Sequence, residues 1–512
     1  MGAYRYDSPM YETGNILCSV DEVRALECAQ ISTGRSAQVM MEDAGCAAFQ
    51  LLRQSWPHAD RILVYCGGGN NGGDGYVLAR LASVSGFAVN VVALAPPSTP
   101  EAQEAQERAQ AVGIFPKQHS RRLLEDTDVV VDALLGIGVQ GTLREPYALV
   151  ISEINECAPR RFAIDIPSGL SADSGAVETD AVNADVTITF IRHKRGMVTG
   201  FGPNHCGRVV LKDLNVGQGI WGREGLSTPW GYRISRDWVE GALPKRPACA
   251  HKGIAGALLV IGGGIGMAGA PVLAGRAALR SGVGRVTIAC HPDCQVAAAA
   301  RSPELMVAAL RTPGELKELL ARSNAVVIGP GLGQDTWAQE VYSTVRDYDI
   351  PKVFDADALN LLAAGPVGVS RAVLTPHPGE AGRLGQTDAG NVQRNRPAVA
   401  EMLAAQLADV CVLKGAGTLV AQAQKPTLVC DRGHPGMATA GMGDVLSGVI
   451  GALIAQGLSG YQAAGVGVWI HAVAGERAGK RRGGIGLLAT DLEPFLMELR
   501  TAMDSAGMRN GR

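Results

Sequence analysis

The chain of 512 residues is poor in aromatic and charged side chains, and its positive and negative charges nearly cancel. Aromatic residues make up 5% of it and charged residues 19%. The 47 Lys and Arg face 49 Asp and Glu, for a net charge of -2. No basic tract or stripe interrupts this balance. Because a nucleic-acid-binding surface needs clustered positive charge, we expect no nucleic acid among the main partners.

Cysteines are present but follow no ligand or disulfide pattern. There are 11, and none forms a CxxC pair. The two nearest each other, Cys290 and Cys294, enclose His291, but no second ligand pair of similar spacing accompanies them. A zinc site is therefore the weaker interpretation. Free thiols are typical of a reducing compartment, so we expect a cytoplasmic protein.

Signals for secretion and membrane insertion are also missing. The first residues are polar and lack the apolar core of a signal peptide. Residues 253–275 and 445–475 carry no formal charge, but glycines and polar residues interrupt both stretches. Neither is a continuous apolar run of ~20 residues. We expect both to be buried elements of an α/β core, and we expect no membrane segment.

Glycine is the residue in excess. The chain has 66 glycines, roughly twice the usual share of ~7%. They have no collagen-like period, so they must serve tight turns and close backbone approaches. Much of the excess falls in short turns, at 67–75, 136–141, 262–266, 331–333, 415–417 and 433–443. A phosphate or a dinucleotide would need bare backbone at such places.

Apolar strand-like runs alternate with helical segments in two separate halves of the chain. The runs are 61–66, 87–94, 128–135, 161–167, 184–190 and 207–214, then 256–262, 285–290, 305–310, 324–330, 352–357, 372–377 and 410–415. This alternation predicts two α/β domains with mostly parallel sheets covered by helices. The aperiodic segment 217–233 separates them. We therefore predict domains at 1–222 and 234–512, a linker at 223–233, and a disordered or dimer-edge tail of roughly 16 residues at the start.

Polar side chains stand at three predicted strand ends of the first half. GGGNNGGDG (67–75) is neither GxGxxG nor a P-loop, and no Lys in the chain precedes Ser or Thr. Its Asn71 would meet Asp132 and Ser168 at the carboxyl edge of a parallel sheet. Three hard oxygen donors suit an alkali or similar cation. The alternatives are a helix-capping Asn in a tight turn and a capping role for Asp132.

The second half has a helix start that suits phosphoryl transfer. Glycines before a helix expose N–H groups to phosphoryl charge, and Asp444 in GMGD could accept a hydroxyl proton there. The alternative is an ordinary N-cap Asp. Other polar groups at strand ends are Asp355, Asp357, His377, Glu380, Lys414 and Thr418. For His377 the alternative is a turn histidine without a role in the site.

Together these motifs resemble one known family. NNGGDG, VDALLGIGVQG and DIPSG resemble the N-terminal domain of the bifunctional NAD(P)H-hydrate repair enzymes, over roughly residues 17–215. KGIAG, GPGLG, TPHPGE, KGAGT and GMGD are similar to their C-terminal domain, over about 232–503. The resemblance implies a Rossmann-like domain that epimerises R and S hydrates of NADH and NADPH. It also implies a ribokinase-like domain that dehydrates the S form.

The resemblance also assigns residues in the first domain. Substrate binding is expected at Asn70, Asn71, Gly72, Gly73, Asp74, Gly136, Ile137, Gly138, Val139, Gln140, Gly141, Thr142, Tyr147 and Asp165. Potassium is expected at Asn71, Asp132 and Ser168. Asp165 is the candidate acid/base, since a strand-end carboxylate can move the proton that inversion at a C6 hemiaminal requires. The alternative is a structural carboxylate bonded to loop N–H groups.

In the second domain the resemblance implies a nucleotide as co-substrate. Nucleotide contacts are expected at Lys414, Gly415, Ala416, Gly417, Thr418 and Gly443, and hydrate contacts at Ala255, Gly331, Gly333, His377 and Asp444. The domain order favours ADP, converted to AMP and phosphate, with Mg²⁺ bridging the phosphates. Asp444 is the candidate base. A vitamin-precursor kinase and a binding module for the first domain are the alternatives, and we expect a homo-oligomer.

Overall fold

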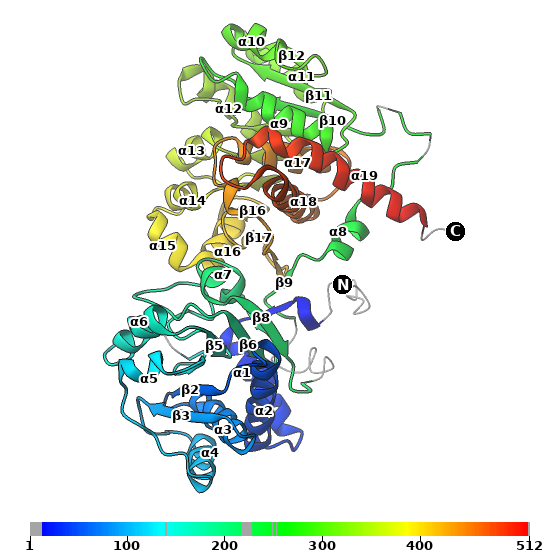
Figure 1. The fold of residues 1–512 in the computed structure, drawn as a ribbon. Helices are drawn as coiled ribbons and strands as arrows, with labels where there is room; N and C mark the ends of the chain where they lie inside the picture. The colour runs from blue at the N-terminus through cyan, green and yellow to red at the C-terminus, as the bar shows by residue number, and fades with distance from the viewer. Residues whose placement is uncertain (1–12, 139–140, 217–227, 248, 252, 510–512) are drawn as a thin grey trace. The chain divides into compact units, whose positions relative to one another are not determined.

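The computed structural model describes residues 13–138, 141–216, 228–247, 249–251 and 253–509 (Figure 1). The predicted N-terminal tail up to residue 12, Val139, Gln140 and the first part of the predicted linker lie outside the described residues. Contacts within the chain divide it into two compact units, with the division between Tyr232 and Arg233. Each unit has its own sheet and helices.

The sheet of the N-terminal unit is parallel and has the strand order β3-β2-β4-β5-β6-β8. Its strands are β2 (Arg61–Cys66), β3 (Ala88–Ala93), β4 (Val129–Ala133), β5 (Arg161–Ile164), β6 (Val186–Phe190) and β8 (Arg208–Lys212). All six fall inside the predicted apolar runs. From β2 the chain first adds β3 on one side and then β4 on the other. Such a reversal opens a crevice at the carboxyl ends of the strands, where ligands bind in open α/β sheets.

Helices cover both faces of this sheet. They are α1 (Val20–Ser32), α2 (Ala37–Ser55), α3 (Asn70–Val84), α4 (Pro100–Ala111), α5 (Arg121–Glu125), α6 (Tyr147–Cys157) and α7 (Gly202–His205). Three short strands complete the unit: β1 (Ile16–Cys18), β7 (His193–Lys194) and β9 (Gly231–Arg233). Leu63 and Tyr65 pack toward α6, while Val64 and Cys66 lie against α3. Burial on both faces explains why β2 is a continuous apolar run.

The C-terminal unit repeats this plan with more strands, in the order β12-β11-β10-β13-β14-β15-β16-β17-β18. The parallel strands are β10 (Ala257–Ile261), β11 (Arg285–Cys290), β12 (Met306–Ala309), β13 (Ala325–Ile328), β14 (Lys352–Phe354), β15 (Ala372–Leu374) and β16 (Val410–Leu413). Antiparallel β17 (Thr418–Ala421) and β18 (Thr427–Cys430) follow. The strand order reverses at β10, which again places a crevice at the carboxyl edge.

The helices of this unit include most of the uncharged stretch 445–475. They are α8 (Arg236–Ala242), α9 (Gly269–Arg280), α10 (Gln295–Ala299), α11 (Pro313–Ala321), α12 (Thr336–Asp347), α13 (Asp357–Ala364), α14 (Pro378–Leu384), α15 (Ala389–Arg394), α16 (Arg396–Gln406), α17 (Met442–Ala455), α18 (Gly460–Arg482) and α19 (Glu493–Arg509).

Helix α17 is the buried centre of the C-terminal unit. Nearly all of its residues are buried, as the sequence predicted for 445–475. A Cβ placed on Gly448 would lie 2.1 Å from the carbonyl oxygen of Ala274, so glycine is what lets α17 approach α9. Within the described ranges, none of the helices combines the length and the apolar character that a membrane span needs.

Candidate active sites

The crevice of the N-terminal unit contains a cavity of about 640 Å³. Most of the substrate-binding residues predicted for this unit line it: Asn70, Asn71, Asp74, Gly136, Ile137, Gly138, Tyr147 and Asp165. Gly72 and Gly73 are buried inside α3, and Gly141 and Thr142 do not line the cavity. The expected residues thus lie along one edge of this cavity, and their contacts with a substrate stay predictions. Glu27 of α1 and Lys194 of β7 line it too and were not predicted.

The segment Asn70–Gly75 differs from the expectation of a glycine turn. The turn after β2 is only Gly67–Gly69, and Asn70 already begins α3. A Cβ on Gly72 would lie 2.0 Å from the carbonyl oxygen of Gly67. Glycine within a helix costs about 1 kcal/mol relative to alanine, yet here it lets the helix start directly over the strand end. The polar side chains therefore project from a first helical turn rather than from a loop.

The three predicted cation ligands lie together around Leu135. Ser168 donates two hydrogen bonds to Asp132, from Oγ to Oδ1 at 2.6 Å and from the backbone N to Oδ2 at 2.8 Å. Leu135 N donates to Ser168 Oγ at 2.9 Å, and Asn71 Nδ2 donates to Leu135 O at 3.2 Å. Burial raises the pKa of Asp132 to about 6, against the hydrogen bonds from Ser168.

One oxygen of this group has no protein partner. Asn71 Oδ1 is buried, and no described residue donates a hydrogen bond to it. A buried carbonyl oxygen is normally satisfied, so an atom in this position requires an explanation. A hard cation held by Asn71 Oδ1 and the neighbouring oxygens would supply the missing partner.

Asp165 lies just after β5 in a left-handed backbone conformation, with φ of 65°. Non-glycine residues held in this region cluster at functional sites. Its Oδ1 accepts hydrogen bonds from Thr189 Oγ1 at 3.3 Å and from Phe190 N at 3.1 Å, and it forms an ion pair with Lys194. One carboxylate oxygen is thus tied to the backbone N–H of Phe190, which is the last residue of β6 and not part of a loop.

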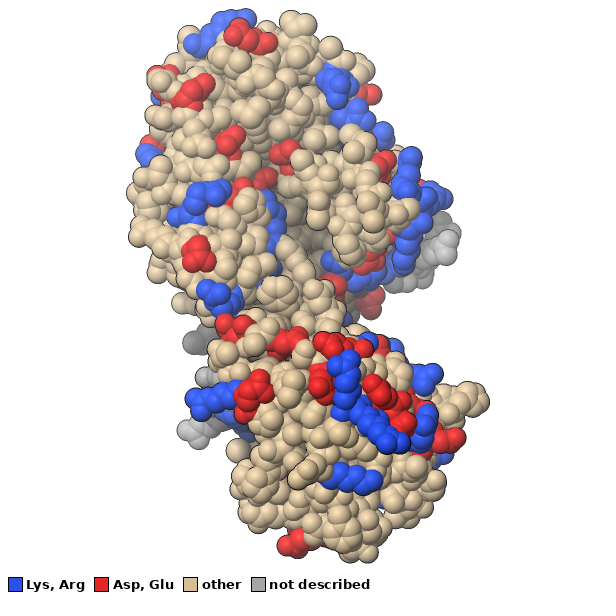
Figure 2. All heavy atoms as spheres, turned by 60° about the vertical axis from the view of Figure 1, so that its left-hand side comes forward, with Lys and Arg blue, Asp and Glu red and all other residues tan. Residues whose placement is uncertain are grey.

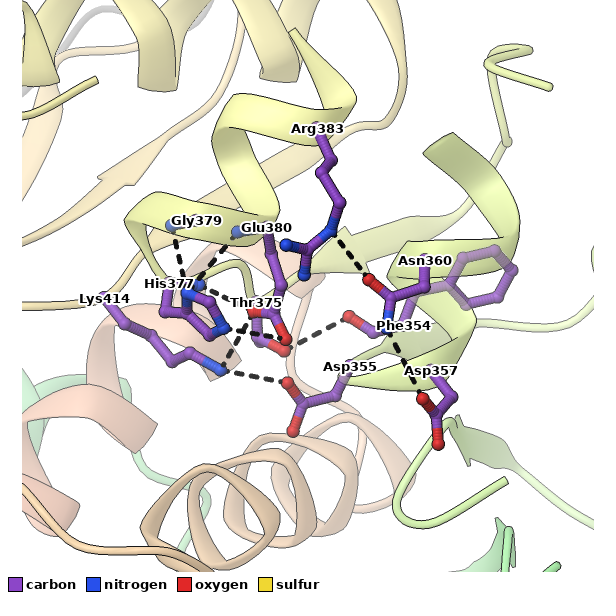
Figure 3. Close-up of polar contacts among 10 residues, drawn as sticks. All are labelled: Phe354, Asp355, Asp357, Asn360, Thr375, His377, Gly379, Glu380, Arg383 and Lys414. Carbon is purple, nitrogen blue, oxygen red and sulfur yellow. Dashed lines mark hydrogen bonds and ion pairs between the residues drawn. The ribbon is translucent and has the colours of Figure 1, made fainter. Parts of the chain in front are cut away.

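In the C-terminal unit, Lys414 joins two acidic side chains at the strand ends (Figure 3). Its Nζ lies 3.0 Å from Asp355 Oδ1 and 3.7 Å from Glu380 Oε2. Burial alone would lower the pKa of Lys414, but the two carboxylates and Asp444 outweigh it and raise the value. The ammonium is therefore kept charged at the end of β16.

Asp444 stands against this pair in the first turn of α17. A Cβ on Gly443 would lie 3.3 Å from Lys414 Nζ and 3.7 Å from Asp355 Oδ2, so the helix start touches both groups. Burial, then repulsion by Asp355, raises the pKa of Asp444 to about 7 although Lys414 opposes the shift. A carboxyl group with this pKa can exchange a proton near neutral pH.

His377 is the N-cap of α14 rather than a turn histidine, and its expected contact with the hydrate stays a prediction. Its Nδ1 accepts from Gly379 N at 3.0 Å, and Glu380 Oε2 accepts from His377 N at 2.8 Å. Burial lowers the pKa of the imidazole, although the charge of Glu380 opposes the shift. The side chain is half exposed, with 52% of its surface accessible, and the ring stays open on one side.

The glycine turn after β13 is fixed by Asp357. Gly333 N donates to Asp357 Oδ2 at 2.9 Å, and Gly264 N from the turn after β10 donates to Gly331 O at 2.7 Å. These two turns therefore form one edge of the site. The face of the C-terminal unit visible in the upper part of Figure 2 is hollowed, with acidic and basic side chains at the edge of the hollow.

Ala255 does not belong to this edge. It precedes the first residue of β10, and the adjacent Gly256 packs against Ala455 at the far end of α17. Eleven residues of helix separate Ala455 from Asp444, about 16 Å at 1.5 Å per residue. The KGIAG segment leads into the amino end of the strand, whereas the site lies at the carboxyl end. We therefore leave Ala255 out of the proposed site.

Arg396 supports the backbone of the site, and no sequence motif indicated it. It is fully buried beneath the turn 415–417 and donates to the carbonyl oxygens of Lys414, Leu413 and Gly417 at 3.2, 3.3 and 3.4 Å. Burial lowers its pKa to about 10. The guanidinium thus holds the backbone of the predicted nucleotide turn from below.

A second cavity, of about 600 Å³, borders the glycine-rich loop 433–441 that leads to α17. It is lined by His434, Pro435, Gly436, Ala438, Thr439, Gly479, Gly483, Gly484, Ile485, Gly486 and Leu487. Apart from the excess of glycine, nothing in the sequence pointed to it. Within the part of the chain that the structure describes, no three His, Cys, Asp or Glu side chains are arranged to hold a metal ion.

Comparison with known proteins agrees with this arrangement. Residues 258–497 match the family described as NAD(P)H-hydrate dehydratase, and residues 37–196 match the family described as YjeF-related protein N-terminus. The C-terminal unit is similar to a solved ribokinase-like superfamily protein from Enterococcus faecalis V583. That match has 26% identity and a TM-score of 0.50, and it covers 55% of this chain and 99% of that one.

Two relatives match nearly the whole chain. The bifunctional NAD(P)H-hydrate repair enzyme of Coxiella burnetii is 43% identical over 484 residues, which covers 93% of this chain and 98% of the relative. The enzyme of the same name from Escherichia coli K12 is 40% identical over 468 residues, which covers 91% and 90%. The chain therefore belongs to the family of bifunctional NAD(P)H-hydrate repair enzymes.

Proposed function

We propose that the two units carry out successive steps in the repair of hydrated NADH and NADPH. The N-terminal unit interconverts the R and S hydrates, and the C-terminal unit dehydrates the S form while ADP becomes AMP and phosphate. The observation that supports this division most is the pair of separate polar sites, one around Asp165 and one around Asp444, each at the carboxyl edge of its own sheet.

In the first step the cavity of about 640 Å³ holds the hydrated nicotinamide ring. Asp165 reaches the cavity from the end of β5 and takes the proton of the C6 hydroxyl group. Asn71, Asp132 and Ser168 hold potassium at the adjoining strand ends. This is supported by the partnerless Asn71 Oδ1 among oxygen donors. When bound, the ion supplies positive charge beside the turn after β4.

In the second step the difficulty is the leaving group, because hydroxide leaves C6 poorly. Phosphorylation of the hydroxyl group makes it a good leaving group, and elimination then restores the nicotinamide ring. Asp444 takes the hydroxyl proton during the transfer, and its pKa of about 7 suits that task. The N–H groups at the start of α17 face the phosphoryl charge.

The nucleotide lies along the turn from Lys414 to Thr418 and against Gly443. The cavity beside the loop 433–441 is large enough for its nucleoside part. Magnesium supplies charge to the phosphates when bound, and Asp355 and Glu380 are the hard oxygen donors that would hold it, directly or through water. Gly331, Gly333 and His377 complete the hydrate side of the site.

The test is a mixture of R and S NADPH hydrate with ADP and Mg²⁺. We expect both forms to be converted to NADPH, with AMP and phosphate released. Recovery of only the S fraction would contradict the epimerase step. Recovery without nucleotide would contradict phosphorylation, and a stable phosphorylated product would indicate a kinase. Running ATP in parallel tests the preference for ADP.

Two further proposals concern the protein as a whole. We propose a homo-oligomer, and we propose a cytoplasmic location because free thiols are typical of a reducing compartment. Light scattering coupled to size exclusion measures the oligomeric state. A monomer at micromolar concentration would contradict the proposed homo-oligomer.

A further inference from the structure

Besides Arg24, four carboxyl or ammonium side chains from four different places in the fold line the cavity of the N-terminal unit. They are Glu27 of α1, Asp74 of α3, Asp165 after β5, and Lys194 of β7. The three acids outnumber the two basic side chains of the lining, Lys194 and Arg24. Their individual partners decide which acid is charged and which is neutral.

The two oxygens of Asp165 have different surroundings. Oδ1 accepts from Phe190 N and Thr189 Oγ1 and is paired with Lys194. Lys194 in turn donates to Thr189 Oγ1 at 2.9 Å and to Phe190 O at 3.0 Å, so its three hydrogens are all used. Among the described residues none donates to Oδ2. The carboxylate is thus held by one oxygen and presents the other to the cavity.

Asp74 has the opposite surroundings. It projects from the first turns of α3, and within the described ranges its carboxyl group has no hydrogen-bond partner. Burial raises its pKa well above the usual range, repulsion from Asp165 and Glu27 adds to this, and Lys194 opposes it. Cys66, beneath it on β2, is a neutral thiol, because burial raises its pKa in turn. Burial therefore favours the protonated form of Asp74, whereas Asp165 is paired with Lys194.

The sheet brings these two carboxyl groups to the cavity from two different strand ends. β4 lies between β2 and β5, so α3, which follows β2, and Asp165, which follows β5, reach the cavity from opposite sides of β4. Strands two positions apart are about 10 Å apart, which leaves room for a ring between the side chains. Environments that separate two titratable groups in this way assign one as acid and one as base.

We propose that Asp74 and Asp165 are the acid–base pair of the epimerase, with Asp165 Oδ2 as proton acceptor, Asp74 as proton donor, and Lys194 as the positioning residue that orients Asp165. This rests on the proposed epimerisation and goes beyond it, because it gives Asp74 a catalytic role in addition to substrate binding.

The proton transfers balance without any oxidant or reductant. Asp165 removes the proton of the C6 hydroxyl group as the C6–N1 bond breaks and a C6 carbonyl forms, and Asp74 gives its proton to N1. Rotation about the C5–C6 bond turns the other face of the carbonyl toward N1. The reverse transfers close the ring, so Asp74 regains its proton and the oxygen regains its own from Asp165.

The decisive variant is Asp74→Asn, which keeps the shape of the side chain but cannot transfer a proton. We expect kcat for epimerisation of purified R-NADPH hydrate to fall by about 100-fold or more, with KM changed far less. Wild-type kcat in this variant would overturn the proposal. If the wild-type protein itself does not epimerise the hydrate, the proposed function fails instead, and the two failures are thereby distinguished.

A pH profile of the full-length protein supplies a readout that a structural role would not move. Epimerisation should decline as rising pH deprotonates Asp74. Glu27→Gln removes one of the charges that keep Asp74 protonated, so this alkaline limb should shift to lower pH. An unshifted limb would overturn the assignment of the acid.

Lys194 is tested by a pair of variants. Lys194→Met should lower kcat with little change in KM, and Lys194→Arg should restore part of the loss because it keeps a charged donor to Asp165. Equal losses in the two variants would contradict the positioning role.

Discussion

Lys414 Nζ lies 3.0 Å from Asp355 Oδ1, and the start of α17 rests on this ion pair. The pair joins the end of β14 to the end of β16 directly beneath Asp444. It thus connects the turn that we assign to the nucleotide with the carboxylate that we assign as base. Removing the cation would leave Asp355, Glu380 and Asp444 to repel one another in a buried place.

We therefore predict that Lys414→Met lowers dehydration of S-NADPH hydrate by about 100-fold, since charge stabilisation at a phosphoryl group is lost. The C-terminal unit should also lose about 3 kcal/mol of stability, because a buried charge becomes unpaired. Steady-state kinetics and urea unfolding measure these effects. Lys425→Met, at a surface lysine that lies over the ring of Tyr461, is the control and should change neither. Epimerisation should be unaffected.

The pH dependence of dehydration should follow Asp444. Because its pKa is raised to about 7, it is protonated and inactive as a base below that pH and becomes competent above it. We expect the single-turnover rate to rise with pH and to be about thirtyfold lower at pH 5.5 than at pH 8. Asp444→Asn should abolish this step while epimerisation survives. A flat profile between these pH values would exclude Asp444 as the base.

Much of this arrangement could be predicted from sequence, because buried strands are apolar runs that end in glycine, with functional side chains at their carboxyl ends. That logic pointed to Asp165 and Lys414, whereas glycines before a helix start pointed to Asp444, and the roles of all three stay predictions. The sequence did not point to Lys194, because Lys194 belongs to a two-residue strand 29 positions after Asp165. Only the folded chain brings the two residues together. Sequence alone also did not show that Ala255 precedes β10 at the opposite edge, and its expected contact with the hydrate stays a prediction.

Potassium should control the first step through Asn71. We expect epimerisation to rise with KCl at constant ionic strength and to respond little to choline chloride. Asn71→Leu removes the buried Oδ1 and should abolish the response to potassium, with a lowered basal rate. Asn70→Leu, whose side chain bonds Thr99 instead, should keep the response even if it weakens hydrate binding. A wild-type rate that is the same in both salts would contradict the cation site.

Arg396 should act on nucleotide binding from beneath the turn. Arg396→Met leaves the carbonyl oxygens of Lys414, Leu413 and Gly417 without their donor, so the turn relaxes. We expect the KM for ADP to rise about tenfold and stability to fall by about 3 kcal/mol, since unpaired buried acceptors each cost about 1–3 kcal/mol. The KM for ADP and the stability of Arg396→Lys should lie between those of the wild type and of Arg396→Met, because a single ammonium cannot reach all three carbonyls.

A matched variant separates the effect on the turn from general destabilisation. Lys352 is likewise buried and also donates to three carbonyl oxygens, those of Val345, Arg346 and Tyr348, but it does so at the end of α12. Lys352→Met should therefore cost similar stability in urea unfolding without changing the KM for ADP. If both variants raise this KM equally, the effect comes from lost stability, and Arg396 has no specific role at the nucleotide turn.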